Sequence, residues 1–221
     1  MQYKETSKDE ALRDVIKSVM LYEQVLRDKK ILFITKSKEN RIEIIEAMFK
    51  KENFFHLTGL KIKNQNISSS LFYQMCLNHK LSLKDFEFKD KTTNLKLEIL
   101  PQIIKIEKLA NQIGAFANSG KLLKTDILVG TTRNSCLGLK FIEKNQIYVP
   151  NTVLKEDIRK ITTKRNRIIA ILKKDLRQNK YEKIPYIAKN ANIKTLCQNK
   201  EVLLRIDIEK ITKVDNAINI I

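Results

Sequence analysis

Residues 126–149 read DILVGTTRNSCLGLKFIEKNQIYV, and this stretch decides the fold class. It holds three short apolar runs, 126–130, 137–142 and 146–149, which polar turns separate. Apolar runs of about four to eight residues between turn residues are typical of β-strands. The turn at 143–145 indicates that the last two strands pair antiparallel. A sheet is therefore expected in the second half of the chain.

The first half of the chain carries mainly helical periodicity. Apolar side chains recur every three or four residues between residues 8 and 28, which predicts an amphipathic helix with one core-facing stripe. Further helices are expected at 69–79 and along 95–113. In the latter, Pro101 either kinks the helix or begins it, and Gly114 ends it.

Two more hairpins complete the predicted fold. The runs 31–34 and 42–49 flank a polar turn, and so do the runs 167–172 and 181–188. The tail after Asn192 is compatible with a strand or with a loose helix. We therefore predict an α+β protein in which N-terminal helical elements pack on a twisted antiparallel sheet.

The chain is strongly basic, and its charge is unevenly distributed. It has 43 Lys and Arg against 25 Asp and Glu, a formal net charge of +18. Residues 119–221 carry 22 − 10 = +12 of this charge, whereas residues 1–118 carry 21 − 15 = +6. A codon bias toward Lys, Asn and Ile explains part of the excess, but it would spread the charge evenly. The concentration predicts a polyanionic partner, with nucleic acid ahead of an anionic membrane surface.

Missing features exclude several classes of protein. The sequence has no run of 18 apolar residues that could cross a membrane and no apolar signal-peptide core after Met1. The three cysteines lie far apart without a CxxC pair, which favours a reducing cytosol over a disulfide framework or a zinc site. P-loop, GxGxxG and HExxH motifs are absent, as is a carboxylate cluster suited to two metal ions. No cofactor or metal is predicted, so cleavage of nucleic acid would use the 2′-hydroxyl of RNA.

His56 is the first candidate catalytic residue. It precedes Leu57, Thr58 and Gly59, and the glycine permits a sharp turn. We expect the imidazole at the end of a strand beside the Thr58 hydroxyl, where a base with a near-neutral pKa can transfer protons. A histidine bonded inside the core is an equally good interpretation. The other histidine, His79, is expected to satisfy carbonyl groups at a helix end.

The loop 130–135 and the basic run 160–167 are candidate phosphate-binding segments. The loop offers the Arg133 guanidinium and the Ser135 hydroxyl, although an ordinary polar loop is the alternative. The basic run suits a phosphate backbone, with a solvated rim as the alternative. The candidate RNA contacts are Lys140, Lys160, Lys164, Arg165, Arg167 and the possible stacking residue Tyr148.

The segment 55–60, FHLTGL, resembles the "FxHLTG" signature of phage-borne members of the Barnase–EndoU–colicin–RelE ribonuclease superfamily. The order of several later motifs is similar to that in the fourth phage branch of this superfamily. The resemblance spans about residues 8–190. Those motifs are LP at 100–101, QIG at 112–114, TDILVG at 125–130, LGL at 137–139 and YVPNT at 148–152, leading into DI at 157–158. The resemblance implies helices packed on an antiparallel sheet whose exposed face holds the active site, metal-independent RNA cleavage, and a gene on a prophage or another mobile element.

The resemblance also implies roles for single residues. His56 matches the characteristic histidine of the family, with Thr58 as its neighbouring hydroxyl. Arg133 and Ser135 lie where the family has polar residues between its later strands. In the leading hypothesis His56 is the general base or acid, Arg133 and Lys140 stabilise the phosphorane, and Thr58 and Ser135 orient the phosphate.

The leading hypothesis is thus a toxin-like, metal-independent endoribonuclease that acts in the cytoplasm. Residues 1–190 would form the nuclease domain, and residues 191–221 an extension packed on the same domain. RNA is its expected partner, together with an antitoxin or immunity protein, and its oligomeric state is left open. The main alternative is a basic, non-catalytic nucleic-acid-binding phage accessory protein. A third interpretation is a partner-binding protein whose charge reflects codon bias alone.

Overall fold

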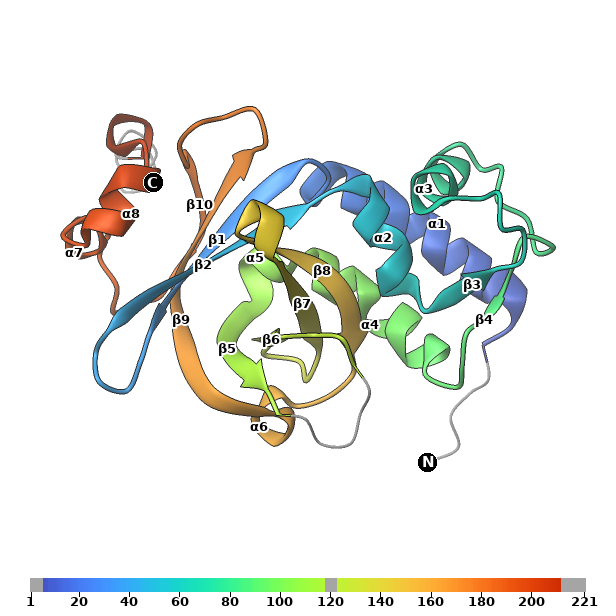
Figure 1. Ribbon diagram of the computed structural model, residues 1–221, viewed down its shortest axis with the longest axis horizontal. Helices are drawn as coiled ribbons and strands as arrows, with labels where there is room; N and C mark the ends of the chain where they lie inside the picture. The colour runs from blue at the N-terminus through green and yellow to red at the C-terminus, as the bar shows by residue number, and fades with distance from the viewer. Residues whose placement is uncertain (1–5, 118–122, 212–221) are drawn as a thin grey trace.

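The described chain, residues 6–117 and 123–211 of a computed structural model, combines helices and strands (Figure 1). The helices are α1 (Lys8–Val25), α2 (Lys51–Thr58), α3 (Ser69–Leu77), α4 (Thr93–Ile104), α5 (Ile106–Leu109), α6 (Ile158–Ile161), α7 (Ile193–Leu196) and α8 (Lys200–Arg205). The strands are β1 (Lys29–Lys36), β2 (Ile42–Phe49), β3 (Leu60–Ile62), β4 (Phe86–Phe88), β5 (Ala110–Phe116), β6 (Ile127–Thr131), β7 (Cys136–Ile142), β8 (Ile147–Leu154), β9 (Thr162–Asp175) and β10 (Lys183–Ile187). A 3₁₀ turn, η1 (Glu143–Asn145), joins β7 to β8.

Helix α1 confirms the first predicted helix. The Ser7 hydroxyl accepts a hydrogen bond from the Glu10 N–H, and the Glu10 carboxylate accepts one from the Ser7 N–H. This reciprocal capping box satisfies two N–H groups that the first helical turn leaves free. The buried stripe of α1 includes Val15, Val19 and Tyr22, which face the core as the periodicity predicts.

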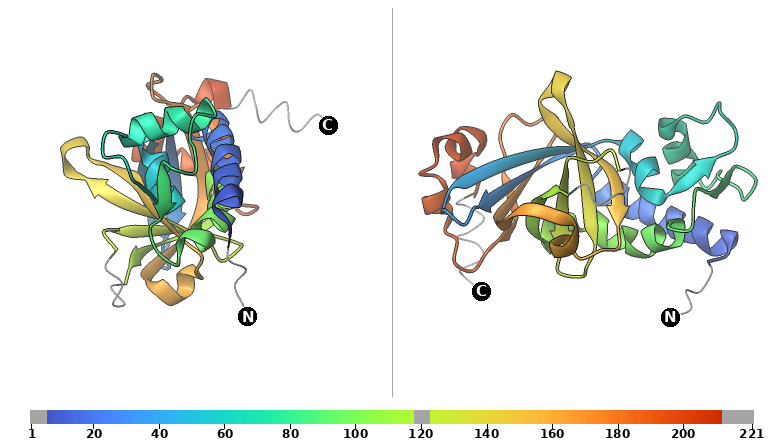
Figure 2. Two further views of the ribbon diagram at one scale, coloured as in Figure 1. Left: turned by 90° about the vertical axis from the view of Figure 1, so that its right-hand side faces the viewer. Right: turned by 60° about the horizontal axis from the view of Figure 1, so that its bottom comes forward.

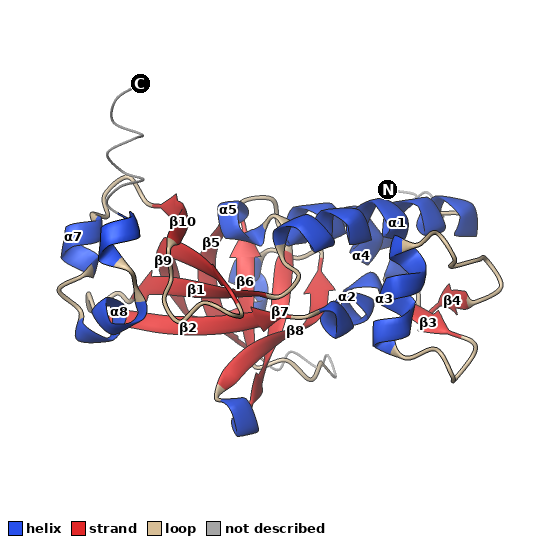
Figure 3. Ribbon diagram, turned by 90° about the horizontal axis from the view of Figure 1, so that it is seen from above, coloured by secondary structure: helices blue, strands red, loops and turns tan. Residues whose placement is uncertain are grey.

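Helices α1 to α4 and the small β3–β4 sheet gather at one end of the molecule (Figures 1 and 3). Four buried aromatic rings pack together there: those of Tyr22, Phe54, Phe72 and Tyr73, with ring centroids 5.3 to 6.4 Å apart. Most of these contacts are edge-to-face, the geometry that aromatic quadrupoles favour. Across residues 6–117 and 123–211, the helices are too short or too polar to cross a membrane.

The large sheet closes into a barrel of seven strands. Its strand order is β1-β2-β8-β7-β6-β5-β9, β9 pairs back onto β1, and β10 extends the sheet beside β9. The predicted α+β class is confirmed, but the open antiparallel sheet is corrected in two respects. The sheet is closed, and it is mixed because β2 and β8 run parallel, with Ala47 opposite Tyr148. Closure removes two open edges that would otherwise expose unpaired backbone groups.

Strand β9 makes the closure possible. It is 14 residues long, and its first half pairs with β5 while its second half pairs with β1. Lys164 has a positive φ of 46°, and the register shifts opposite Gly114 between Ile113 and Ala115. Such bulges bend a strand and increase its twist, which allows one strand to serve two neighbours.

Residues 110–113 form a strand, where the sequence predicted the end of a helix. Helix α4 ends at Ile104, with Pro101 in its last turn, and α5 ends at Leu109. Strand β5 then pairs with β6 on one edge and β9 on the other. These two ladders override the helical spacing of the apolar residues, because propensity is weaker than tertiary context.

The C-terminal helices lie at the end of the barrel opposite α1 and α4 (Figures 2 and 3). Val202 and Leu196 pack with Leu32, Leu172 and the buried Tyr181 in a second apolar cluster on the outer side of β1 and β9. Residues 200–205 are helical, and Ile206 makes a bridge to Tyr181. The prediction for 212–220 lies outside the described residues.

Candidate functional site

His56 lies in a helix, which corrects its expected place at the end of a strand. Helix α2 spans Lys51–Thr58, and the Asn53 side chain accepts a hydrogen bond from the Lys50 N–H at 2.8 Å. Phe54 and Leu57 are buried on one face of α2. Gly59 ends the helix with a φ of +70°, a conformation that a side chain would strain.

Thr58 holds the end of α2 together. Its hydroxyl donates to the Phe55 carbonyl at 2.8 Å and accepts from the Leu60 N–H at 3.1 Å, and the residue is fully buried. The Gly59 carbonyl accepts a 2.7 Å hydrogen bond from the buried Thr93 hydroxyl of α4. The Thr58 hydroxyl is therefore committed to the backbone and is not offered to a ligand beside His56.

The His56 side chain, in contrast, is exposed and makes no hydrogen bond or ion pair with any residue in the described ranges. One side of its ring lies near Phe55, with centroids 5.8 Å apart. Partial desolvation lowers the pKa of His56 below its usual value of 6.5, and the nearby positive charge of Lys89 lowers it further. The ring is consequently neutral at neutral pH and can accept a proton.

Two lysines and one aspartate surround this helix end. The Lys96 side chain packs so closely on Gly59 that an added Cβ would lie 2.8 Å from Lys96 Cδ. Burial lowers the pKa of Lys96, Asp90 opposes the shift, and Lys89 adds to it. The Asp90 carboxylate accepts hydrogen bonds from the Thr92 N–H and hydroxyl, and these bonds hold its pKa low. The side chains near His56 thus carry a net positive charge.

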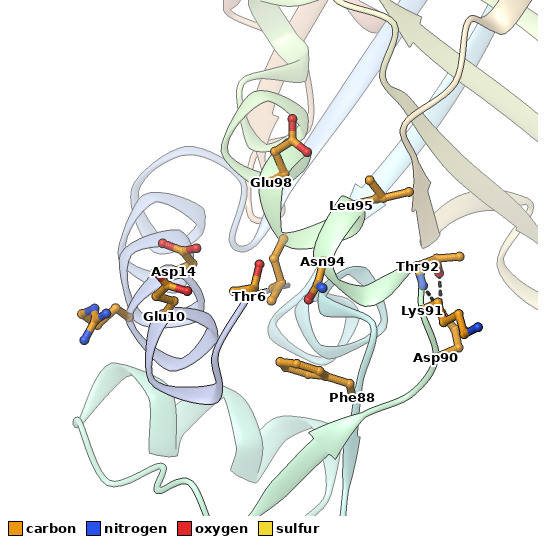
Figure 4. Close-up of a pocket in the computed structure, with 12 residues that line it drawn as sticks. Thr6, Glu10, Asp14, Phe88, Asp90, Lys91, Thr92, Asn94, Leu95 and Glu98 are labelled. Carbon is orange, nitrogen blue, oxygen red and sulfur yellow. Dashed lines mark hydrogen bonds between the residues drawn. The ribbon is translucent and has the colours of Figure 1, made fainter. Parts of the chain in front are cut away.

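A cleft of about 1060 Å³ lies beside this region, between α1, β4 and α4 (Figure 4). Four carboxylates line it, those of Glu10, Asp14, Asp90 and Glu98, against two cations, Arg13 and Lys91, which gives 2 − 4 = −2. These charges disfavour a phosphate inside the cleft. In the ranges 6–117 and 123–211, no three His, Cys, Asp or Glu side chains are grouped so that they could hold a metal ion.

The β6–β7 turn brings the second set of predicted residues together. The Thr131 and Ser135 hydroxyls lie 2.7 Å apart, and Thr131 also accepts from the Arg133 N–H at 3.2 Å. Ser135 is fully buried, whereas Arg133 is exposed at the tip of the turn. The Ser135 hydroxyl therefore stabilises the turn, and of this pair only the Arg133 side chain faces solvent.

The predicted RNA contacts fall on two surfaces. Lys140 is exposed on β7. The half-buried Tyr148 ring packs on Phe141, with the ring centroids 5.0 Å apart. Both residues belong to the β7–β8 hairpin, which projects from the barrel (Figure 2). The four cations of the basic run are exposed on α6 and β9: Lys160, Lys164, Arg165 and Arg167. Arg165 and Arg167 line a groove of about 540 Å³ together with Lys36 and Lys38, which we call the basic groove.

The structure separates His56 from the basic groove. Lys36 is at the turn end of the β1–β2 hairpin, whereas Phe49 at the other end leads into α2. Sequence reasoning did not identify Lys36 and Lys38, because their closeness to Arg167 depends on barrel closure. It also missed Lys89 and Lys96, whose only sequence signal was the basic composition of residues 89–96.

Comparison with known protein families supports the resemblance in sequence. The sequence model of the family described as phage-Barnase-EndoU-ColicinE5/D-RelE like nuclease 4 matches residues 14–190. That range covers 190 − 14 + 1 = 177 of the 221 residues and includes His56, the β6–β7 turn and the basic run. Searches of curated proteins and of solved structures returned no match.

Proposed function

The chain belongs to the phage-Barnase-EndoU-ColicinE5/D-RelE like nuclease 4 family, and from this premise we propose that it is a metal-independent endoribonuclease with His56 as its general base. The observation that carries the proposal is the state of the His56 side chain. Among residues 56–59, Leu57 and Thr58 are buried and Gly59 closes the helix, whereas the imidazole is exposed and uncommitted. Residues 56–59 thus form a helix end whose buried side chains leave the His56 imidazole facing solvent.

The proposed reaction uses the nucleophile that RNA itself carries. His56 accepts the proton of a 2′-hydroxyl, and the resulting oxygen attacks the adjacent phosphorus. The bond from phosphorus to the 5′-oxygen breaks, and that oxygen takes a proton from water or from the protonated His56. The products are a 2′,3′-cyclic phosphate and a 5′-hydroxyl. Lys89, whose positive charge acts on His56, is the cation proposed to stabilise the extra negative charge of the phosphorane.

Other predicted site residues receive adjusted roles in this proposal. Thr58 and Ser135 act as positioning residues, because both hydroxyls are buried and bonded inside the protein. Arg133 and Lys140 are exposed cations and are proposed as contacts to the RNA phosphates. Tyr148 is half-buried against Phe141, so we assign it to packing of the hairpin.

The reaction type can be tested directly on the products. Purified protein is incubated with end-labelled single-stranded RNA in EDTA, and the fragments are examined for 2′,3′-cyclic phosphate ends. The proposal expects cleavage with cyclic ends, and no cleavage at a step whose nucleotide carries 2′-deoxyribose. Fragments with 3′-hydroxyl ends, or cleavage at the 2′-deoxy step, would exclude attack by the 2′-hydroxyl.

One observation favours a second function, namely nucleic-acid binding without catalysis. The basic groove lies away from His56, so a phosphate bound between Arg167 and Lys36 does not meet the imidazole. RNA that binds in a salt-dependent way and stays intact under all the conditions above would establish this alternative.

A further inference from the structure

The basic groove is built on three neighbouring strands of the barrel. Arg167 of β9 lies opposite Lys36 of β1 on one edge and opposite Gln112 of β5 on the other. Side chains directly opposite each other in antiparallel pairs project from the same face of the sheet. Lys36, Arg167 and Gln112 therefore form one row across the outer surface, whereas the neighbouring Ile113 and Ile168 face the core.

This row places two positive charges side by side. Like charges directly opposite each other destabilise a sheet, unless an anion lies between them. The residues that line the groove include two further cations, Lys38 and Arg165, and no Asp or Glu. The neighbouring Glu43 carboxylate accepts a hydrogen bond from the Asn166 side-chain amide at 2.7 Å, and counting its charge with the four cations still leaves 4 − 1 = +3. The groove thus has an excess of positive charge that internal carboxylates do not neutralise.

The groove also has polar groups that suit phosphate oxygens. Ser37 and Asn190 line it, and together with the cations they offer N–H and O–H donors. The bulge at Lys164 and Arg165 lies over Gly114, where an added Cβ would come within 3.0 Å of the Arg165 side chain. Gly114 therefore permits the close approach of Arg165, whose guanidinium also donates to the Arg159 carbonyl at 2.7 Å.

The basic groove and α2 lie at opposite ends of the β1–β2 hairpin. Lys36 and Lys29 are at opposite ends of β1, and Lys29 is paired with Phe49, two residues before α2. At about 3.3 Å per residue, the seven steps of β1 span about 23 Å. This span is several times the spacing of successive phosphates along a nucleic-acid strand, which is about 3.4 Å in a duplex, so the groove and the α2 end of β1 contact different phosphates.

We infer that the basic groove binds backbone phosphates of the RNA at a distance from the cleavage step, so that long RNA is a better substrate than a dinucleotide. The inference rests on the proposed function for its cleavage readout, but the binding itself does not depend on catalysis. Phosphate contacts hold a strand in register without reading its bases. The groove is therefore expected to select for length and not for sequence.

The test uses two double variants with the same change in charge. K36A/R167A removes the opposed pair of the groove, and K80A/K84A removes two exposed lysines elsewhere. Binding is measured with a 2′-O-methyl RNA that cannot be cleaved, over a range of salt concentrations. Each phosphate contact to a single strand contributes about 0.7 to the slope of log K against log salt, so we expect K36A/R167A to reduce that slope by about 1.4 and K80A/K84A to leave it nearly unchanged.

The cleavage arm compares a dinucleotide with a long RNA that contains the same step. We expect K36A/R167A to lower kcat/KM for the long RNA by about tenfold or more and to leave dinucleotide cleavage unchanged. Equal salt slopes of RNA binding for the two double variants would overturn the inference. So would an equal loss of kcat/KM for the dinucleotide and the long RNA in K36A/R167A. If the wild-type protein cleaves neither substrate, the proposed function fails, while the binding arm still decides the role of the groove.

Discussion

The Thr93 hydroxyl donates a 2.7 Å hydrogen bond to the Gly59 carbonyl and thereby fixes the end of α2 to the start of α4. Both residues are buried, so water cannot replace this bond. The bond joins the segment that presents His56 to the helix that carries Lys96. The orientation of the candidate base consequently depends on a contact between segments 34 residues apart.

Replacement of Thr93 by valine tests this connection. Valine keeps the shape of the side chain but removes one of the two donors of the Gly59 carbonyl, which also accepts a hydrogen bond from the Lys89 N–H at 3.2 Å. A typical buried hydrogen bond contributes about 0.5–1.5 kcal/mol net, so the free energy of unfolding of Thr93→Val should fall by that amount. Urea unfolding with an unchanged m-value measures it. The exposed Thr163→Val is the control and should change stability by less than about 0.5 kcal/mol; equal losses in both variants would contradict the role of Thr93.

The pH dependence of cleavage should report the environment of His56. Partial desolvation and the charge of Lys89 favour the neutral ring and hold its pKa below 6.5, so the rate should fall as the pH drops through that lowered pKa. Lys89→Ala removes the positive charge that opposes protonation, so the acidic limb of log(kcat/KM) should move to higher pH. Lys144→Ala, at the hairpin tip, should leave the limb in place. A limb that Lys89→Ala does not move would show that another group titrates.

The packing of α7 and α8 on the outer side of β1 and β9 should depend on a hydrogen bond between Tyr181 and Glu46. The buried Tyr181 hydroxyl donates to the Glu46 carboxylate at 2.6 Å, and Lys30 lies 3.2 Å from the other carboxylate oxygen. A hydrogen bond to a charged group contributes about 1.5–3 kcal/mol, so Tyr181→Phe should lower the free energy of unfolding by that amount. Tyr186→Phe is the matched control, since its hydroxyl bonds to no residue in the described ranges. Comparable losses in the two variants would contradict the role of this bond.

Local signals in the sequence predicted several elements correctly. The long apolar stripe predicted α1, and the polar turn at 143–145 predicted the β7–β8 hairpin. In α2 the helical signal is spread over only eight residues, and the aromatic pair before His56 is equally typical of a strand. The sequence therefore identified the candidate base but not the element that carries it.

Long-range pairing could not be predicted in the same way. Lys36 and Arg167 are 167 − 36 = 131 residues apart, and nothing local to either shows that β1 and β9 pair. Barrel closure, the basic groove and the helix-to-strand change at Ala110 all depend on such pairings. Likewise, the polarity of Ser135 suggested a ligand contact, but its bond to Thr131 turns the hydroxyl inward.

The most direct test of the account is the single-turnover rate of RNA cleavage in EDTA for two histidine variants. His56→Ala removes the proposed base, whereas His79→Ala removes an exposed histidine that follows α3. Loss of a general base typically lowers the rate by about 10²–10⁴-fold. The account predicts a loss of that size for His56→Ala, with unchanged RNA binding, and a wild-type rate for His79→Ala. Cleavage by His56→Ala at the wild-type rate, with the same cyclic-phosphate ends, would contradict it.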